Sequence, residues 1–581
     1  MTAKKRYKRR INHGVIQPTF TNRGVQQTFR QLCELALKDT PPQYREGLFV
    51  GLLDLMRQIG ENTFCEPAGA SLNAVATALA VSREMTPMFR ISSLNNKLLA
   101  FHREAAALAI SAEGVLPDSY LAANGTENQR DEVFLNWWSQ LIRNSLYQGD
   151  TLARITNALV LTGLRGFCGL PKDSELIESL FNKYLNVRAE DYFVVLFALW
   201  SQSLTEVLTH GDIFFKNSTS EDPLNIVFEA VTRDLSKPIS DSIYNIEKMR
   251  TFSGHSLAEA FFARWPLIQV GEQSFAFAGH HFLEVQLIYK FLAKALALAR
   301  QDEKNSRTKF SQFMAKRFED FVCELLKLTN INFEPEHRYE RGQEKKSADF
   351  TLFEKHGSNS VVTLMQLKLK MFQEVSFYGA SMESLLKDVE KDFARSITQT
   401  IRYLRHLNSA ADNNRLEQES EVISRRIMRA EKIMIVCVTP EFPAMFTSWP
   451  LRNRLLEAIK IELGDDWEWF NEKYNGRWEW HVIGLNELET FISLPRAKHD
   501  FHKQLYVYLR DSGIDRQQFD NGYRLPKDFR NFLITRHQRF DKETQTKRIV
   551  PIPQLKETFD SFANDVIAMM AFKTTELVLP D

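Results

Sequence analysis

The chain has 581 residues, of which 44% are hydrophobic and 25% are charged. This is an ordinary globular composition, and it excludes a wholly disordered, collagen-like or coiled-coil chain. The length predicts about three to five domains. Because 74 basic residues stand against 73 acidic ones, nucleic acid would have to be bound by local patches of charge rather than by the net field.

The beginning of the chain is basic and lacks the features of a secretory signal. The first ten residues, MTAKKRYKRR, contain six lysines or arginines, and no apolar core follows them. We expect residues 1–23 to be a basic flexible tail. The longest apolar runs, such as Tyr192–Trp200, are far shorter than the roughly 20 residues that span a bilayer. We therefore expect a cytoplasmic protein without a membrane segment.

Residues 24–300 are predicted to form a large helical N-terminal domain. Apolar residues recur there at intervals of three and four, for example in Asp191–Val207. The segment Trp265–Phe277 departs from this pattern, because two short apolar runs flank Gly271-Glu272. Such an arrangement is typical of a β-hairpin.

Residues 308–490 are predicted to form an α/β domain. A helix with an apolar stripe from Phe310 to Leu326 comes first. Strands are predicted at Asn332–Tyr339, Ser347–Phe353, Val361–Lys370, Lys432–Thr439 and Trp478–Ile483, with a hairpin tip at 355–359 and a long helix at Ser381–Leu407. The order α-β-β-β-α-β, followed by one more strand, indicates a mixed sheet with helices packed on it. Residues 497–581 are predicted to be a separate helical C-terminal region, so the expected fold class is α+β and multidomain.

Polar side chains converge in the middle of the 308–490 domain. Asp349 lies on the second predicted strand, and Gln366 and Lys368 lie on the third. Residues two apart on a strand share a face, so Gln366 and Lys368 point the same way. If the second and third strands pair through their tip, Asp349 can face the same side. Glu319, beside the apolar stripe of the preceding helix, can reach this place if that helix lies on the sheet.

These residue types suit the hydrolysis of a phosphodiester bond. Mg²⁺, or Mn²⁺ in its place, prefers oxygen ligands, and Asp349 and Glu319 offer carboxylates. Gln366 offers a neutral oxygen, and Leu367 offers its backbone carbonyl. Lys368 would orient or deprotonate the attacking water, or stabilise the charged phosphate as a fixed cation. An amide at Gln366 in place of an acid removes a charge, which predicts weaker metal binding.

The order of these residues resembles a known nuclease superfamily. Glu319, then Ser-Ala-Asp349, then Gln366-x-Lys368 in the α-β-β-β-α-β order looks like the PD-(D/E)XK nucleases, and the glutamine variant is similar to the Mrr-like restriction endonucleases. The resemblance covers about residues 308–490 and implies a restriction-endonuclease-like αβββαβ core. The chain departs from the family pattern in two places: Ser-Ala replaces proline before Asp349, and Gln366 replaces an acid.

A further match lies on the next predicted helix. Gln399 and Tyr403 are similar to the Q-x-x-x-Y element of RecB-type nucleases, which lies near the active site and contacts DNA. Four residues apart, they share a helix face. Residues 309–405 contain 16 basic and 14 acidic residues, so DNA affinity would rest on a local cluster. The candidate members of this cluster are Lys345, Lys346, Lys368, Lys370 and Arg402.

Each candidate also has a purely structural interpretation. Lys368 and Lys370 could protect an edge strand from aggregation, although the apolar run that holds them is typical of a central strand. Asp349 could be a turn residue and Glu319 a solvated helix residue. Gln399 and Tyr403 could hydrogen-bond where a helix meets the sheet. Elsewhere, His280, His281 and Glu284 have metal-binding side chains but lack the H-E-x-x-H order, so packing or capping is preferred for them.

The sequence therefore predicts a metal-dependent endonuclease that acts on DNA. Analogy with the family suggests a role in restriction or anti-phage defence. Two alternatives stay open: a catalytically inactive nuclease-fold protein that binds nucleic acid or a partner, and an RNase on the same scaffold. The chain contains no G-x-x-x-x-G-K-[ST] motif. Whether it works with an ATPase, with another partner protein or as a homo-oligomer is left open by the sequence.

Overall fold

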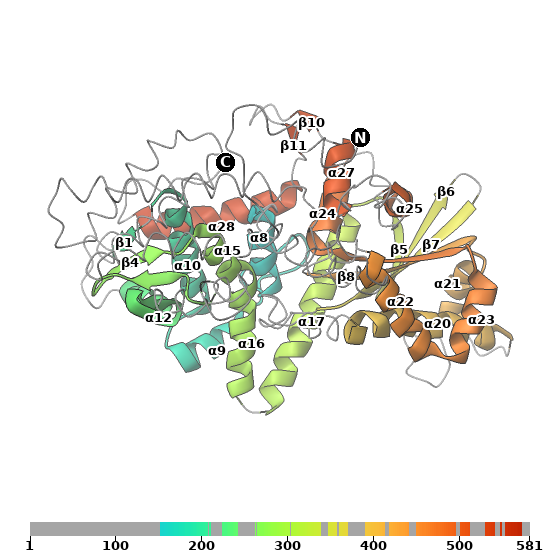
Figure 1. Cartoon of the computed structure of the whole chain (residues 1–581), viewed down its shortest axis with the longest axis horizontal. Coiled ribbons are helices and arrows are strands. Elements are labelled where there is room, and N and C mark those ends of the chain that lie inside the picture. Colours follow the sequence, from blue (N-terminus) through green and yellow to red (C-terminus); the bar gives the residue numbers. More distant parts are fainter. Residues whose placement is uncertain are drawn as a thin grey trace, which may run out of the picture. The chain divides into compact units, whose positions relative to one another are not determined.

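Figure 1 shows the computed structural model of the chain. The structure describes residues 151–206, 208–210, 223–241, 262, 264–302, 304–337, 347–356, 359–369, 390–412, 418–440, 449–494, 500–511, 529–537, 539–540, 547–548 and 552–571. The predicted basic tail at 1–23, and the part of the predicted helical domain before residue 151, lie outside these ranges. Within them, no helix combines the length and the apolar character needed to cross a membrane.

The described part is α+β and mostly helical, with two small mixed sheets. The chain divides into two compact units, of which the first holds the described residues of 187–287 and 566–571, and the second those of 151–186 and 288–565. Residues 151–186 thus belong to the second unit, although they fall within the range predicted for the N-terminal domain.

The first unit combines helices with a four-stranded sheet in the order β1-β4-β3-β2. Its helices are α10 (Ala189–Thr205), α12 (Pro223–Leu235) and α15 (His280–Val285), and its strands are β1 (Leu208–His210), β2 (Ser236–Pro238), β3 (Leu267–Gln269) and β4 (Ser274–Phe277). Strands β3 and β4 pair antiparallel with Leu267 opposite Phe277, which confirms the predicted hairpin. The prediction missed β1 and β2, because strands of three residues are too short to show an alternating pattern.

The second unit carries the candidate site and is built around a five-stranded sheet. Its helices are α8 (Thr151–Leu161), α9 (Glu175–Leu185), α16 (Phe291–Gln301), α17 (Lys304–Lys327), α20 (Arg395–Asp412), α21 (Gln418–Met428), α22 (Trp449–Leu463), α23 (Asp465–Tyr474), α24 (Leu485–Ser493), α25 (Phe501–Asp511) and α27 (Phe529–His537). Two π-helical turns, η3 (Gln286–Lys290) and η4 (Glu390–Ala394), precede α16 and α20, and α28 (Pro553–Ala571) ends the described chain. Strands β10 (Arg539–Phe540) and β11 (Lys547–Arg548) form a separate two-stranded pair.

The larger sheet has the order β5-β6-β7-β8-β9, so strands follow one another as in the sequence. The strands are β5 (Asn332–Pro335), β6 (Phe350–His356), β7 (Asn359–Leu367), β8 (Lys432–Thr439) and β9 (Trp478–Gly484). The first three pair antiparallel and the last three pair parallel, so the predicted mixed sheet is confirmed. Strands β7 and β8 are central and are covered on both faces, which explains why they read as continuous apolar runs.

Helices cover both faces of this sheet. Helix α20 packs against β7 and β8, and α21 lies on the same face, where the Arg426 guanidinium stacks 3.7 Å from the ring centroid of Phe353. Helix α25 covers the opposite face, where the rings of Tyr508 and His481 are 5.3 Å apart. The sequence predicted a separate helical region from residue 497. Instead, α25 packs on the sheet, because its apolar stripe at Phe501, Leu505 and Tyr508 needs a surface to cover it.

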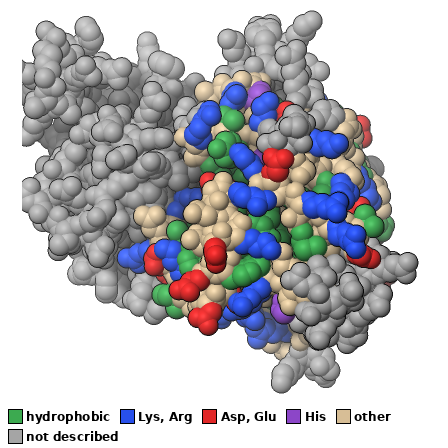
Figure 2. All heavy atoms as spheres, turned by 90° about the vertical axis from the view of Figure 1, so that its right-hand side faces the viewer, with side chains coloured by type: hydrophobic (Ala, Val, Ile, Leu, Met, Phe, Trp, Pro, Cys, Tyr) green, Lys and Arg blue, Asp and Glu red, His purple; other side chains and the backbone are tan. Residues whose placement is uncertain are grey.

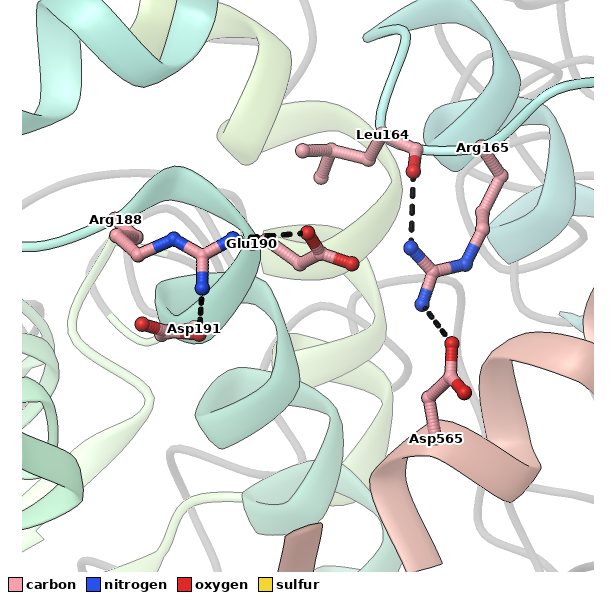
Figure 3. Close-up of polar contacts among 6 residues, drawn as sticks. All are labelled: Leu164, Arg165, Arg188, Glu190, Asp191 and Asp565. Atoms are coloured by element: carbon pink, nitrogen blue, oxygen red, sulfur yellow. Dashed lines mark hydrogen bonds and ion pairs between the residues drawn. The ribbon is translucent and has the colours of Figure 1, made fainter. Parts of the chain in front are cut away.

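A buried guanidinium fastens α17 to the segment around α8. Arg317 donates hydrogen bonds to the carbonyls of Val160 at 2.9 Å, Arg165 at 2.9 Å and Pro171 at 2.6 Å. Figure 3 shows that the Arg165 side chain in turn bridges the Leu164 carbonyl and Asp565 of α28, the latter at 2.7 Å. The same figure shows, in the first unit, Arg188 paired with Glu190 and Asp191 in the first turn of α10. Arg317 thus fixes α17, the helix that carries Glu319.

A buried carboxylate on β6 caps helix α25. The Glu354 side chain is 8% exposed, and its Oε2 accepts a hydrogen bond from the backbone N–H of His502 at 3.1 Å. Burial raises the pKa of Glu354 from 4.5 to about 7, against the lowering effect of the hydrogen bonds from His502 and Phe501. Because the pKa is higher in the folded than in the unfolded chain, this carboxyl stabilises the fold most below about pH 4.5. That stabilisation is lost as the pH rises through 7.

We expect Glu354→Gln to remove this pH dependence, since its amide oxygen can still accept the capping hydrogen bond. Between pH 4.5 and pH 8, wild type should lose up to about 3 kcal/mol of unfolding free energy relative to the variant. Chemical denaturation of both proteins across this range measures the difference. Parallel pH profiles for the two proteins would contradict the prediction.

Candidate functional site

Asp349, Gln366 and Lys368 meet at the end of the larger sheet where β6 begins and β7 ends. Phe350 stands opposite Met365 in the antiparallel register, so the next pair outward is Asp349 with Gln366. Opposite residues share a face, and Lys368 shares it too, because it follows Gln366 by two residues. The backbone N–H of Lys368 donates to the Val438 carbonyl at 2.8 Å, so the extended pairing continues to this residue. The structure therefore brings these three predicted residues together on one face.

The surroundings of Asp349 disfavour the charged form of its carboxyl group. Burial raises its pKa to about 6, and the negative charges of Glu336 and Glu319 add to the increase. Two features oppose the rise: Oδ2 accepts a hydrogen bond from the Leu367 N–H at 2.6 Å, and the Lys368 ammonium lies within electrostatic reach. A cation placed beside Asp349 would offset the repulsion that Glu336 and Glu319 exert on its charged form. Leu367, predicted to offer its carbonyl, contacts Asp349 through its N–H.

Gln366 is a buried polar residue whose side chain has no hydrogen-bond partner among the described residues. It is 8% exposed and stands opposite Cys437 of the parallel neighbour β8. Among the residues that the structure describes, none forms a hydrogen bond with its side-chain amide. Its polar atoms are not among the fully enclosed side-chain atoms that lack a partner, so the amide is open to water or to another group from outside the chain. Cys437 is not suited to act as a nucleophile at this place, because burial raises the pKa of its thiol to about 12.

Glu319 lies near this place but is engaged by its own helix. Its side chain is 37% exposed, and its Oε1 is 3.7 Å from the Lys316 ammonium one turn earlier on α17. Its negative charge raises the pKa of Asp349, so the two carboxylates lie near enough to interact, in line with the sequence prediction. The negative charge of Glu336 also raises the pKa of Asp349, and by more than that of Glu319 does. The structure thus adds a carboxylate that the sequence prediction did not include.

Glu336 follows β5, the edge strand beside β6. Pro335 stands opposite Phe350, and Glu336 and Asp349 are the next residues of the two segments. The pairing then shifts by one residue, since the Ser347 N–H donates to the His337 carbonyl at 3.0 Å. The residue was missed because β5 is short and its alternation is weak, which leaves the register of the segment undefined in the sequence. In the sequence, the only sign that Glu336 belongs to this strand is the alternation of the polar residues Asn332, Glu334 and Glu336.

The residues present fit a magnesium ion held mainly by neutral oxygens. Within the described ranges, no three side chains of His, Cys, Asp or Glu gather closely enough to hold a metal ion. Mg²⁺ usually keeps several waters and takes only one or two carboxylates from the protein. Two carboxylates with the unpartnered amide of Gln366 match that preference. Among the described residues no such group forms around His280 and Glu284 either, and Glu284 is buried near the end of α15.

The residues predicted to contact nucleic acid differ in their exposure to solvent. Tyr403 is 3% exposed, and its hydroxyl lies 3.4 Å from Nε2 of His337, so it belongs to the seam between α20 and the sheet. Gln399, one turn earlier, is exposed. Arg402 donates to the Glu462 carbonyl at 2.8 Å and pairs with the carboxylate of the same residue at 3.5 Å. Lys370, with Lys345 and Lys346, lies outside the described residues.

A second group of cations surrounds the opposite end of the sheet. Lys355 stands opposite Ser360, whose carbonyl accepts from Glu431 N–H at 3.0 Å, and Arg477 donates to the Ala430 carbonyl at 2.6 Å. The cations gathered here are Lys355, Arg425, Arg426, Arg429, Lys432 and Arg477. Figure 2 views this side and shows Lys and Arg side chains spread across its described part. Lysines and arginines are therefore numerous at this end of the sheet, together with the acids Glu421, which pairs with Arg425, and Glu431.

Comparison with known proteins does not assign this chain. No family model matches it, and neither a curated protein nor a solved structure is significantly similar to it. A function for the chain has to be inferred from the geometry of its own residues.

Proposed function

We propose that the chain is a metal-dependent endonuclease that hydrolyses phosphodiester bonds, with DNA as its substrate. One observation carries the proposal: a half-buried carboxylate, an amide that forms no hydrogen bond with the described residues and a lysine share one face at the end of the central strands. The element order α17-β5-β6-β7-α20-β8 agrees with the αβββαβ order of the PD-(D/E)XK resemblance. By analogy, the proposed setting is restriction or anti-phage defence in the cytoplasm.

The proposed roles follow from the chemistry of each side chain. A bound Mg²⁺ or Mn²⁺ would supply charge neutralisation at the phosphate and a water of lowered pKa. Asp349 and Glu319 would hold the ion, and Gln366 would contribute its amide oxygen. The Lys368 ammonium orients the attacking water and offsets the charge that develops on the phosphate.

The charge distribution supports binding to a polyanion. The net charge of +1 provides no long-range attraction, so backbone phosphates would be held by local cations. The patch that includes Arg426, Arg429 and Lys432 provides such cations at one end of the sheet. Exposed Gln399 is the member of the Q-x-x-x-Y pair that remains accessible to a substrate, while Tyr403 steadies α20 against the sheet.

Incubation of the purified chain with duplex DNA, single-stranded DNA and RNA tests the proposal. We expect cleavage of DNA with Mg²⁺ or Mn²⁺ and none after the addition of a chelator. Cleavage confined to RNA would favour the RNase alternative. Binding of nucleic acid without cleavage of any substrate would favour an inactive nuclease-fold protein, and the absence of both binding and cleavage would contradict all three.

We expect Gln366→Glu to tighten metal binding. The substitution adds a negative charge beside Asp349, and a charge at about 4 Å attracts a divalent cation strongly enough for at least about a tenfold gain in affinity. Titration calorimetry with Mn²⁺ measures the change. Gln312→Glu, which adds the same charge at an exposed position of α17, is the control. Unchanged or weaker affinity would show that Gln366 does not contact the metal.

A further inference from the structure

The lysine of the proposed site has a polar neighbour on the next strand of the sheet, Thr439. Leu367 pairs with Val438 in the parallel register of β7 and β8, and the Lys368 N–H donates to the Val438 carbonyl at 2.8 Å. This hydrogen bond belongs to the same register, so the next pair along the two strands is Lys368 with Thr439. Thr439 also pairs with Gly484 of β9, so it lies within the sheet.

The side chains of Lys368 and Thr439 share one face of the sheet. Gln366 pairs with Cys437, and Lys368 and Thr439 follow these two residues by two positions on their own strands. Neighbouring strands lie about 4.8 Å apart, a gap that the flexible four-carbon stem of a lysine can bridge. The ammonium of Lys368 can therefore reach the Thr439 hydroxyl by rotation of its side chain.

The hydroxyl of Thr439 is a buried polar group that lacks a hydrogen bond. The residue is 0% exposed, and within the part of the chain that the structure describes nothing bonds to its enclosed Oγ1. An enclosed hydroxyl without a partner destabilises the fold, because it has given up its hydrogen bonds to water. At the border of a proposed site, such a group is suited to meet a donor that moves there during the reaction.

The side chain of Lys368 is half-buried and likewise forms no hydrogen bond or ion pair with the described residues. Its positive charge opposes the rise in the pKa of Asp349, which precedes β6, and of the Cys437 thiol on β8. The ammonium is thus within electrostatic reach of both strands that flank β7. Thr439 lies on the β8 side, two residues after Cys437.

We infer that Thr439 is a positioning residue for Lys368. Its hydroxyl oxygen accepts a hydrogen bond from the ammonium and holds it beside Asp349 when substrate is bound. A lysine ammonium has three donors, so two stay available for the attacking water and the phosphate. Hydrogen bonds from a charged donor are the stronger kind, and this one restrains a long side chain. The inference rests on the proposed function, because it concerns the lysine of that site.

Cleavage of duplex DNA by full-length Thr439→Val tests the inference. Valine has nearly the same shape as threonine but no hydroxyl, so the single-turnover rate in saturating Mg²⁺ should fall by at least about tenfold. Mn²⁺ affinity should stay within about twofold of wild type, since no metal ligand is changed. Thr439→Ser keeps the hydroxyl and should recover most of the rate. The melting temperature of Thr439→Val should equal or exceed that of wild type.

Thr363→Val is the matched control. The Oγ1 of Thr363 is also enclosed and, among the described residues, without a partner. Thr363 lies on β7 five residues before Lys368, and an odd separation sets it on the opposite face of the sheet. Its substitution should change the cleavage rate by less than about twofold while shifting the melting temperature in the same direction as Thr439→Val.

A double-mutant cycle shows whether Thr439 acts through Lys368. In a Lys368→Met background the ammonium is absent, so adding Thr439→Val should change the residual rate by less than about twofold. An equal loss in both backgrounds would overturn the inference, because Thr439 would then act on the reaction by another route. Thr439→Ala takes the place of Thr439→Val if the latter does not fold.

The outcomes separate the inference from the proposed function. A wild-type rate in Thr439→Val, or no recovery in Thr439→Ser, would overturn the role of Thr439 and leave the nuclease proposal standing. A lower melting temperature in Thr439→Val would also contradict it, because the hydroxyl would then be bonded within the resting fold. If wild type cleaves no nucleic acid, the proposed function fails and the inference fails with it.

Discussion

Asp349→Asn should lower the rate of DNA cleavage by at least about 10³-fold. The substitution removes the carboxylate that lies opposite Gln366 and within electrostatic reach of Lys368. Loss of a metal ligand forfeits several kcal/mol of charge stabilisation, and each 1.4 kcal/mol is worth about tenfold in rate. Single-turnover cleavage of a labelled duplex in saturating Mg²⁺ measures the effect.

The loss in Asp349→Asn should not come from unfolding. Burial of the Asp349 charge opposes folding near neutral pH, so a neutral amide of nearly the same shape should leave the melting temperature unchanged or raised. Lys368→Ala should lower the cleavage rate by roughly 10²–10³-fold while Mn²⁺ still binds, because the ammonium acts on the reacting groups. Lys309→Ala, at an exposed position of α17, is the control. Unchanged activity in both Asp349→Asn and Lys368→Ala would defeat the site.

Arg317→Met should destabilise the fold by about 3–5 kcal/mol. Arg317 is 4% exposed, and its guanidinium satisfies the carbonyls of Val160, Arg165 and Pro171. Methionine fills much of the volume but leaves these buried carbonyls without hydrogen-bond donors. Each carbonyl that water does not reach then costs about 1–3 kcal/mol of stability. Partial relaxation makes the total smaller than the sum. Chemical denaturation of wild type and variant measures the difference.

The neighbouring Lys316 offers a matched control for Arg317. Its side chain is 64% exposed and forms only surface ion pairs with Glu319 and Asp320. Lys316→Met should therefore change the unfolding free energy by less than about 1 kcal/mol. A loss below about 1 kcal/mol in Arg317→Met as well would mean that water or a shift of the chain replaces the guanidinium.

The strands of the larger sheet were predictable because their signal is local. Buried central strands need an unbroken apolar run, and β8 begins and ends where such a run predicts, at Lys432 and Thr439. The same local alternation sets Gln366 and Lys368 on one face, and the hairpin between β6 and β7 brings Asp349 to that face. The core of the candidate site was therefore readable from the amino-acid order alone.

Some helices gave too weak a pattern to be predicted. Helix α21 lies in a stretch that reads as polar and unpatterned, because only Ser424 and Ile427 are buried among its residues 421–428. The C-terminal helix α25 has a clear apolar stripe, yet the stripe does not reveal which surface it covers. Only the packed structure shows that this surface is the second face of the sheet.

Contacts between distant segments required the folded chain. The charge of Glu336 acts on Asp349 because β5 pairs with β6, and the pairing of this short edge strand is not encoded by its own alternation. Burial of Tyr403 and the pairing of Arg402 with Glu462 likewise depend on which face of α20 meets the sheet and which meets α22. Periodicity in a sequence reports the direction of each side chain within its own element. The partner that it meets is set by how the elements pack, and that information is spread over the whole chain.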